Sequence, residues 1–201
     1  MANLIVIAGP SGSGKGTLIE AVIGRLPGLV LSTSATTRGK RPGEIDGREY
    51  FFLDPVTFQR WIEEDKFLEW AEYSGNRYGT PKSAVEQYLA SGCDVLLEIE
   101  LRGAWQVLAQ MPDALMIFIS PPSLEELECR LRGRNTESDE SIRARLARAC
   151  EEMAEVQAEM GPGGRHRFDY VIVNDTVQRA SDELARVIQE SRDSDEQAYD
   201  R

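Results

Sequence analysis

Residues 9–17 read Gly9-Pro10-Ser11-Gly12-Ser13-Gly14-Lys15-Gly16-Thr17, and this stretch decides the fold of the chain. It follows the apolar run Leu4-Ile5-Val6-Ile7-Ala8, which predicts a buried strand, and it leads into residues 18–23, which predict a helix. A glycine-rich turn between strand and helix aims backbone N–H groups and the positive helix end at one point. Lys15 adds an ammonium group for the β- and γ-phosphates of a nucleotide. The stretch therefore predicts a phosphate-binding loop, which we call the phosphate loop.

The residue after Lys15 departs from the usual pattern of such loops. That pattern is G-x-x-x-x-G-K followed by Ser or Thr, whose hydroxyl coordinates Mg²⁺. Here the position holds Gly16, and Thr17 follows one place later. We therefore expect Thr17, or a water molecule, to help hold Mg²⁺.

The composition suits a single α/β domain with a smaller attached lobe, because 201 residues can bury one substantial core. A formal net charge of −11 argues against broad binding to nucleic acid or to an anionic membrane. Basic residues still cluster locally, which indicates small anionic ligands held at particular places. The two clusters are Arg38, Lys40, Arg41 and Arg48, and Arg130, Arg132, Arg134, Arg143, Arg145 and Arg148. For Arg132 and Arg148, a solvated helix face is an equally good interpretation.

Cysteine and histidine usage exclude several classes of site. Cys93, Cys129 and Cys150 are odd in number and widely spaced, which predicts buried or free thiols in a reducing cytosol and hence a cytoplasmic location. We see no signal peptide and no apolar run near 18 residues, so we expect no membrane association. His166 is the sole histidine, expected at the surface, and this excludes chemistry built on histidine bases or several histidine ligands.

Strand-like runs alternate with helical segments, which is the pattern of a parallel sheet with helices on both faces. The predicted strands are residues 3–8, 29–34, 94–99, 114–119 and 170–173. Capping patterns predict helix starts at Asp54-Pro55, at Thr80-Pro81, where Thr80 is the N-cap, and at Ser123, where Glu126 completes a capping box. Gly92 and Gly133 are predicted to end the second and third of these helices.

Residues 35–80 interrupt this alternation. They are rich in aromatic residues, Gly and Arg, and short strands at 49–53 and 67–73 predict an inserted mixed-sheet lobe. A polar segment at 134–140 joins two arginine-rich helices and predicts a mobile lid. We therefore expect an α/β fold with a core at 1–33, 81–125 and 146–190. The lobe covers 34–80, the lid covers about 126–145, and a frayed tail covers 191–201.

A second anion site is predicted in the inserted lobe. Arg38 and Arg41 lie three residues apart, and together with Tyr50 and Tyr78 they suit the doubly charged phosphate of a nucleoside monophosphate. Glu69 lies among apolar neighbours, and its carboxylate could accept from both N1–H and the 2-amino group of guanine, which adenine lacks. Taken singly, each residue is better explained as a surface Arg, a buried Tyr or a solvated Glu; only their joint occurrence favours the binding site.

At this point the sequence resembles a known family, guanylate kinase, from about residue 4 to residue 190. The motifs that carry the resemblance occur in the family's order. They are Ser34-x-Thr36-Thr37-Arg38-x-x-Arg41-x-Gly43-Glu44, Gly47-x-x-Tyr50-x-Phe52, Glu69-Trp70-Ala71, Tyr78-Gly79-Thr80, Leu97-Glu98-Ile99-Glu100, Pro121-Pro122-Ser123, Arg132-Gly133-Arg134 and Val173-Asn174-Asp175. The segment around Arg38 and Arg41 is the most specific of these, because phosphate loops occur in many enzymes.

The resemblance implies transfer of the γ-phosphoryl group of ATP to GMP, and to dGMP, within purine nucleotide metabolism. It implies that the phosphate loop holds ATP, with Asn174 beside the adenine, and that Glu98 helps place Mg²⁺ and its waters. It assigns the guanine to Ser34, Glu69 and Thr80, with Glu100 nearby, and the GMP phosphate to Arg38, Arg41, Tyr50 and Tyr78. Lys15, Arg38, Arg130, Arg134 and Arg145 are the implied catalytic residues that reach the phosphates.

Some positions depart from the family's commonest pattern. Gly16 replaces the usual Ser, Glu98 and Glu100 stand where Asp is frequent, Arg102 replaces a usual Gln, and Asn135 replaces a usual Gly. Residues 161–167 look like a short insertion. None of these changes removes a phosphate-holding group, so we expect activity to survive them.

Two alternatives stay open from the sequence. Gly16-Thr17 is familiar from adenylate kinases, although Glu69 and the pattern at 34–50 argue against that activity. The other alternative is a catalytically inactive, guanylate-kinase-like binding module, although the chain keeps Lys15, Arg38 and Arg41. The sequence does not predict whether the protein is a monomer or a homodimer.

Overall fold

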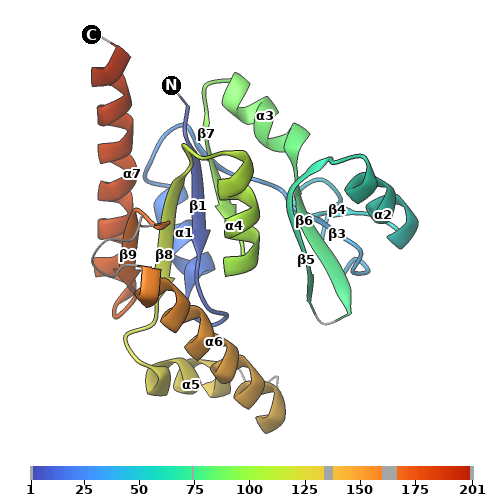
Figure 1. The fold of residues 1–201 in the computed structure, drawn as a ribbon, viewed down its shortest axis with the longest axis vertical. Coiled ribbons are helices and arrows are strands. Elements are labelled where there is room, and N and C mark those ends of the chain that lie inside the picture. Colours follow the sequence, from blue (N-terminus) through green and yellow to red (C-terminus); the bar gives the residue numbers. More distant parts are fainter. Residues whose placement is uncertain (1, 74, 134–137, 160–166, 200–201) are drawn as a thin grey trace.

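The computed structural model describes residues 2–73, 75–133, 138–159 and 167–199, and these form two sheets surrounded by helices (Figure 1). The central sheet has the strand order β2-β7-β1-β8-β9, and all its pairings are parallel. Its strands are β1 (Leu4–Ala8), β2 (Leu29–Leu31), β7 (Asp94–Glu98), β8 (Leu115–Ser120) and β9 (Tyr170–Val173). The predicted α/β class with a parallel sheet is confirmed. Strand β2 is shorter than the predicted 29–34, because the chain leaves the sheet after the exposed Leu31.

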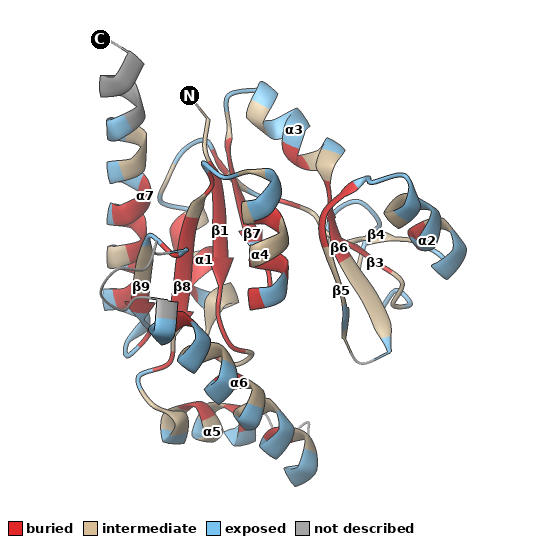
Figure 2. Ribbon diagram, in the orientation of Figure 1, coloured by how far each residue is buried: buried red, intermediate tan, exposed pale blue. Residues whose placement is uncertain are grey.

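Helices cover both faces of this sheet, and Figure 2 shows its three middle strands, β7, β1 and β8, as mostly buried. Alternate residues of β1 point to opposite faces. Leu4, Val6 and Ala8 pack with α3 (Lys82–Ala90), α4 (Leu101–Gln110) and α6 (Asp139–Glu159). Ile5 and Ile7 pack with α1 (Lys15–Ile23) and α7 (Val177–Tyr199). This two-sided burial explains why β1 is apolar at every position.

The second sheet has the order β4-β3-β6-β5 and is mixed, as predicted for the inserted lobe. Its strands are β3 (Ala35–Thr36), β4 (Phe51–Phe52), β5 (Phe67–Tyr73) and β6 (Asn76–Pro81). Helix α2 (Pro55–Glu63) packs on it through Phe58, which stacks on Phe67. Asp54 caps α2 by accepting from the N–H groups of Val56 and Thr57, as predicted. Strand β4 covers only part of the predicted 49–53.

Thr80 corrects a prediction. It does not cap α3, because β6 continues to Pro81 and the helix begins at Lys82 without a side-chain cap. The Thr80 hydroxyl donates instead to Glu69 Oε1, 2.7 Å away across the β5–β6 pairing. A hydrogen bond to a buried carboxylate is stronger than a neutral cap, so the tertiary partner takes the hydroxyl.

Helix α5 (Leu124–Gly133) begins where predicted, since Ser123 Oγ accepts from the N–H of Glu126, and Gly133 is its last described residue. It packs on α6 through Leu127, Leu131, Ile142 and Ala149. The predicted lid therefore covers most of α5 and the start of α6. Arg134, Asn135, His166 and all but the last residue of the 161–167 segment lie outside the described residues.

The tail is the other difference from the sequence prediction. Helix α7 continues through residues 191–199, where fraying was expected. Arg192 fastens this part of the helix by donating to Asp94 Oδ2 at 2.6 Å and to the carbonyl of Pro27 at 3.1 Å. Among the described residues, no helix combines the length and the apolar character needed to cross a membrane.

Candidate active site

The phosphate loop lies at the carboxyl end of β1 and leads directly into α1. Gly14 is the N-cap of α1 with φ of +91°, and a Cβ there would lie 2.4 Å from Asn174 Nδ2. A Cβ on Gly9 would lie 2.2 Å from the carbonyl oxygen of Ile119 in β8. Both positions therefore require glycine, because the loop is pressed against the ends of neighbouring strands. The first-turn N–H groups of α1 remain directed at the loop's concave side.

Lys15 and Glu98 stand at the mouth of this loop. The Lys15 ammonium donates to the carbonyls of Gly9 at 2.6 Å and Pro10 at 3.2 Å, so it curls over the loop. Glu98 ends β7, beside β1. Burial away from water raises the pKa of the Glu98 carboxyl, and the positive charge of Lys15 opposes this rise.

Gly16 faces Glu98. A Cβ on Gly16 would lie 3.7 Å from both carboxylate oxygens of Glu98, which is ordinary van der Waals contact. The Glu98 carboxylate therefore lies within contact distance of the position where a Ser or Thr side chain would begin. Thr17 is exposed on α1 and is not among the residues that line the clefts described below.

A cleft of about 290 Å³ opens between the two sheets. It is lined by the phosphate loop, by the ends of the central strands and by the second sheet. The lining residues are Lys15, Ser34, Tyr50, Glu69, Ala71, Tyr73, Tyr78, Gly79, Glu98, Ile99 and Glu100. The structure thus brings seven of the residues predicted for the site into one cavity, namely Lys15, Ser34, Tyr50, Glu69, Tyr78, Glu98 and Glu100.

Glu69 is the buried acid of this cleft. Its residue is 6% exposed, and burial raises its pKa to about 7, although the hydrogen bond from Thr80 opposes the rise. The pairing of β5 with β6 shifts register between Phe67 and Glu69. Such an irregularity re-aims a side chain, which here directs the carboxylate toward the cleft.

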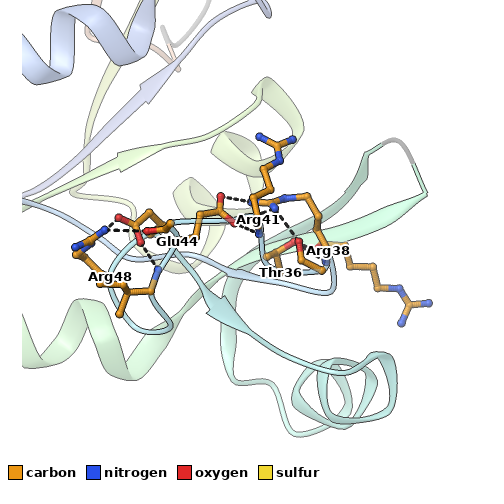
Figure 3. A network of polar contacts seen from close by, with 10 residues as sticks. Thr36, Arg38, Arg41, Glu44 and Arg48 are labelled. Carbon is orange, nitrogen blue, oxygen red and sulfur yellow. Dashed lines mark hydrogen bonds and ion pairs between the residues drawn. The ribbon is translucent and has the colours of Figure 1, made fainter.

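The two predicted phosphate arginines lie at the edge of the second sheet (Figure 3). The Arg38 guanidinium forms a two-pronged pair with Glu44, at 2.7 and 3.0 Å, and lies 5.4 Å from the ring centre of Tyr50. The backbone N–H of Arg41 donates to the same carboxylate at 2.7 Å. Glu44 therefore occupies Arg38 in this structure, and the Arg38 guanidinium holds the pKa of Glu44 at about 2. Arg41 is exposed, and neither arginine is among the residues that line the cleft.

A smaller cavity of about 100 Å³ adjoins the loop on the side of α6. Arg145 lines it and joins two parts of the molecule, because its guanidinium donates to Ser11 Oγ at 3.2 Å and to the hydroxyl of Tyr73 in β5. Helix α6 thus reaches both the phosphate loop and the second sheet through one side chain.

Arg130 and Asn174 hold the phosphate loop through Ser13. Asn174 is 3% exposed, and its side-chain amide donates to the Ser13 carbonyl at 2.7 Å. Arg130 donates to the Asn174 carbonyl at 2.9 Å and to the Ser13 carbonyl at 3.4 Å. Both side chains therefore support the loop from α5 and from the end of β9. The role of Asn174 beside an adenine stays a prediction.

Known proteins resemble this chain over nearly its whole length. A family model described as guanylate kinase matches residues 1–191. The chain belongs to the guanylate kinase family. A guanylate kinase of Rubrobacter xylanophilus is 53% identical over 92% of this chain and 93% of its own length. A guanylate kinase of Synechocystis is 51% identical over 94% of both chains. The crystal structure of guanylate kinase from Anaplasma phagocytophilum superposes with a TM-score of 0.71, at 30% identity, covering 94% of this chain and 86% of that one. The protein is accordingly a nucleoside monophosphate kinase.

Two residues that line the cavities of this guanylate kinase were not assigned to the site from the sequence. Tyr73 follows Glu69 and Ala71 at every second position of β5, so strand alternation could have placed it on the same face. Arg148 was left undecided as a solvated arginine, yet it lines the smaller cavity and donates to Glu100 at 2.5 Å. Arg132, by contrast, lies on a solvated helix face, where it pairs with Glu128 and Asp139.

Proposed function

We propose that this chain transfers the γ-phosphoryl group of ATP to GMP or dGMP, giving ADP and GDP or dGDP, as a cytoplasmic enzyme of purine nucleotide metabolism. One observation carries the proposal: Lys15 of the phosphate loop and Glu69 of the second sheet line the same cleft. A nucleotide phosphate at Lys15 and a base at Glu69 would therefore face each other across one cavity. The free thiols of Cys93, Cys129 and Cys150 agree with a reducing compartment.

Base selection would fall to Glu69. An ionised carboxylate can accept from both N1–H and the 2-amino group of guanine, whereas adenine offers a donor at neither place. The Thr80 hydroxyl occupies one side of Oε1 and so fixes the orientation of the carboxylate. A site built to satisfy such donors discriminates strongly against a base that lacks them. None of the proposed contacts involves the sugar, so dGMP is included.

The monophosphate would bind at the edge of the second sheet near Tyr50 and Tyr78. Arg38 already lies over the Tyr50 ring, and Tyr50 contacts Tyr78 edge-on with ring centres 6.1 Å apart. A dianionic phosphate would compete with Glu44 for the Arg38 guanidinium, because two of its oxygens can accept the same pair of N–H bonds and it carries the larger negative charge. Arg41 is exposed three residues along and would complete the clamp.

The chemical step needs alignment and charge stabilisation more than covalent help, because phosphoryl transfer passes through a loose transition state. Lys15 would hold the β- and γ-phosphates, and Arg145 would swing from Tyr73 to the transferred group. Arg130 would keep the loop in shape through Ser13, and the family pattern adds Arg134. Enclosure by these groups would exclude water, which otherwise hydrolyses ATP.

The donor set at the loop fits Mg²⁺. This ion favours one or two carboxylates together with phosphate oxygens and water, and Glu98 places a carboxylate next to the position of Gly16. Thr17 is exposed, so its part would be through water. When bound, Mg²⁺ neutralises charge on the phosphate oxygens. Among the described residues no group of three metal-ligating side chains occurs, which agrees with an ion held largely by the nucleotide.

A coupled assay of ADP release tests the proposal directly. The protein is given ATP with GMP, dGMP, AMP, CMP or UMP, and we expect turnover with GMP and dGMP only. Preference for AMP would indicate an adenylate kinase, and binding of GMP without turnover would indicate an inactive binding module. Omitting Mg²⁺ should abolish turnover while GMP still raises the melting temperature.

A further inference from the structure

Helix α4 lies between the two sheets and covers the free edge of the second one (Figure 1). Strand β5 is the edge strand there, since the order ends β6-β5. An edge strand carries backbone N–H and C=O groups that no neighbouring strand satisfies. In this protein two amide side chains of α4 bind three of these backbone groups, at Leu68 and Trp70.

These amides bind the backbone on both sides of Glu69. Gln106 accepts from the N–H of Trp70 at 3.1 Å and donates to the Trp70 carbonyl at 3.0 Å. One turn later, Gln110 donates to the Leu68 carbonyl at 2.8 Å. The backbone before and after Glu69 is therefore fixed to a helix of the central domain. The irregular register at this point of β5 is held by α4 as well as by β6.

Gly103 lies one turn before Gln106 on the same face of α4 and meets the carboxylate itself. A Cβ on Gly103 would lie 2.7 Å from Glu69 Oε2, 3.3 Å from Cδ and 3.4 Å from Cγ. The first distance is shorter than real Cβ atoms allow, so the carboxylate would have to move. Glycine inside a helix costs about 1 kcal/mol relative to alanine, so local helix preference does not explain it. The space that it leaves is filled by Glu69.

We propose that Gly103, Gln106 and Gln110 form one positioning face on α4 that sets where the Glu69 carboxylate meets the base, and thereby helps to determine guanine specificity. The inference rests on the proposed function of Glu69 as the group that binds guanine. Gly103 admits the carboxylate, and the two glutamines fix the strand that carries it. None of the three lines the two cavities beside the phosphate loop, so their effect should be confined to the monophosphate substrate.

The main test is Gly103→Ala, with Gly24→Ala as the matched control. Gly24 caps α1 with an ordinary φ of −70°, and a Cβ there meets nothing within 4 Å. We expect Gly103→Ala to raise KM for GMP by about tenfold or more, because a displacement near 1 Å at a binding group is costly. Saturating kcat and KM for ATP should stay within about threefold, and Gly24→Ala should match the parent. An unchanged KM for GMP in a folded Gly103→Ala protein would overturn the inference.

Two further variants test the inference without relying on Gly103→Ala alone. Glu69→Asp shortens the acid by one methylene, so adding it to Gly103→Ala should restore part of the lost GMP affinity, although Glu69→Asp alone weakens it. Gln106→Met keeps the size of the side chain but removes both bonds to Trp70, and it should also raise KM for GMP selectively. If KM for ATP and KM for GMP rise equally, or if the double variant shows simple additivity, the face has only a structural role.

The outcomes separate the inference from the proposed function. If the parent protein does not use GMP, the proposed function fails, and the inference about α4 fails with it. If the parent uses GMP, and folded Gly103→Ala leaves KM for GMP unchanged, the function stands and the positioning face is wrong. Should Gly103→Ala lose its cooperative melting transition, the Gln106→Met result decides.

Discussion

Glu69 carries a conflict between stability and binding that follows from its burial. Transfer of a carboxylate out of water disfavours its charged form, which is why the pKa of Glu69 is raised to about 7. The proposed guanine contact nevertheless requires the ionised form, which accepts but does not donate. The unliganded protein therefore bears a cost at neutral and higher pH that the substrate's two donors would offset.

Replacing Glu69 by glutamine should expose this cost. The folded-state pKa of about 7 lies above the reference value of 4.5, so the acid's contribution to stability is fully present below pH 4.5 and is lost as the pH rises through 7. Glutamine does not ionise and can still accept from Thr80. We therefore expect Glu69→Gln to be more stable than the parent by roughly 3 kcal/mol at pH 8 and about equal at pH 4.

Urea unfolding at the two pH values measures this difference, and Glu86→Gln on the exposed side of α3 is the control. The same Glu69→Gln protein should lose most of its GMP turnover, because the amide presents an N–H to a donor of the base. A Glu69→Gln protein that is less stable than the parent at pH 8 would contradict a raised pKa at this position.

At the residue level, several residues that line the cleft could be predicted from the sequence, but several of the contacts between them could not. The identities of Lys15, Glu69 and Tyr78 and their co-location in one cleft agree with the motif pattern. The occupation of Arg38 by Glu44, and of Arg145 by Ser11 and Tyr73, depends on distances between segments that no local pattern encodes. Thr80 was wrongly predicted as a helix N-cap for the same reason. A capping pattern can be found in neighbouring residues, whereas the observed partner of Thr80, Glu69, lies on another strand.

At the level of elements, the phosphate loop depends on a contact with a distant strand end. Gly14 needs glycine for two separable reasons: its φ is +91°, and its Cα faces the Asn174 amide. Gly28 shares only the first, because its φ is +76° and a Cβ there meets nothing within 4 Å. Comparing alanine at the two positions therefore isolates the steric contact from the backbone strain.

We expect Gly28→Ala to lose roughly 1–2 kcal/mol of stability, the usual cost of a left-handed non-glycine residue, with unchanged kinetics. Gly14→Ala should lose more, because Asn174 must shift and release the Ser13 carbonyl. It should also raise KM for ATP and lower kcat. Urea unfolding and steady-state kinetics measure both effects. Equal losses of stability with an unchanged KM for ATP would show that Asn174 does not shape the loop.

Elements were predicted best where one local pattern is sufficient. The buried strands of the central sheet and the Asp54 and Ser123 caps follow from apolar runs and capping residues. The ends of β2 and β6 depend on when the chain leaves one sheet to join the other, which is a tertiary event. The helical residues 191–199 were missed because their composition is that of a solvated tail, while the anchor of this segment, Asp94, lies far away in sequence.

At the scale of the whole molecule, function and stability lie at opposite ends of the central sheet. The carboxyl ends of β1 and β7 face the clefts, as is general for open parallel sheets. The amino ends are fastened by Asp94, which starts β7. Its side chain is 7% exposed, accepts from the N–H of Asn3 at 2.7 Å and pairs with Arg192 at 2.6 Å. Helix α7 is thereby joined to β1, to β7 and, through Pro27, to the segment before β2.

Arg192→Ala should therefore destabilise the fold without changing the catalytic site. Removing the guanidinium leaves a buried carboxylate with one donor, and breaking such a pair costs more than its formation gains. Because Arg192 is itself 21% exposed, we expect a loss of about 2 kcal/mol in urea unfolding rather than the full cost of a buried charge. The matched control is Arg186→Ala on the same helix, whose pair with Glu190 is about half exposed, so its removal should leave stability almost unchanged. KM for GMP and for ATP should stay at the parent values in both proteins, since the pair lies at the other end of the strands. A changed KM for GMP or for ATP in Arg192→Ala would contradict this expectation. It would show that the position of α7 affects the phosphate loop through β1, which adjoins both of them.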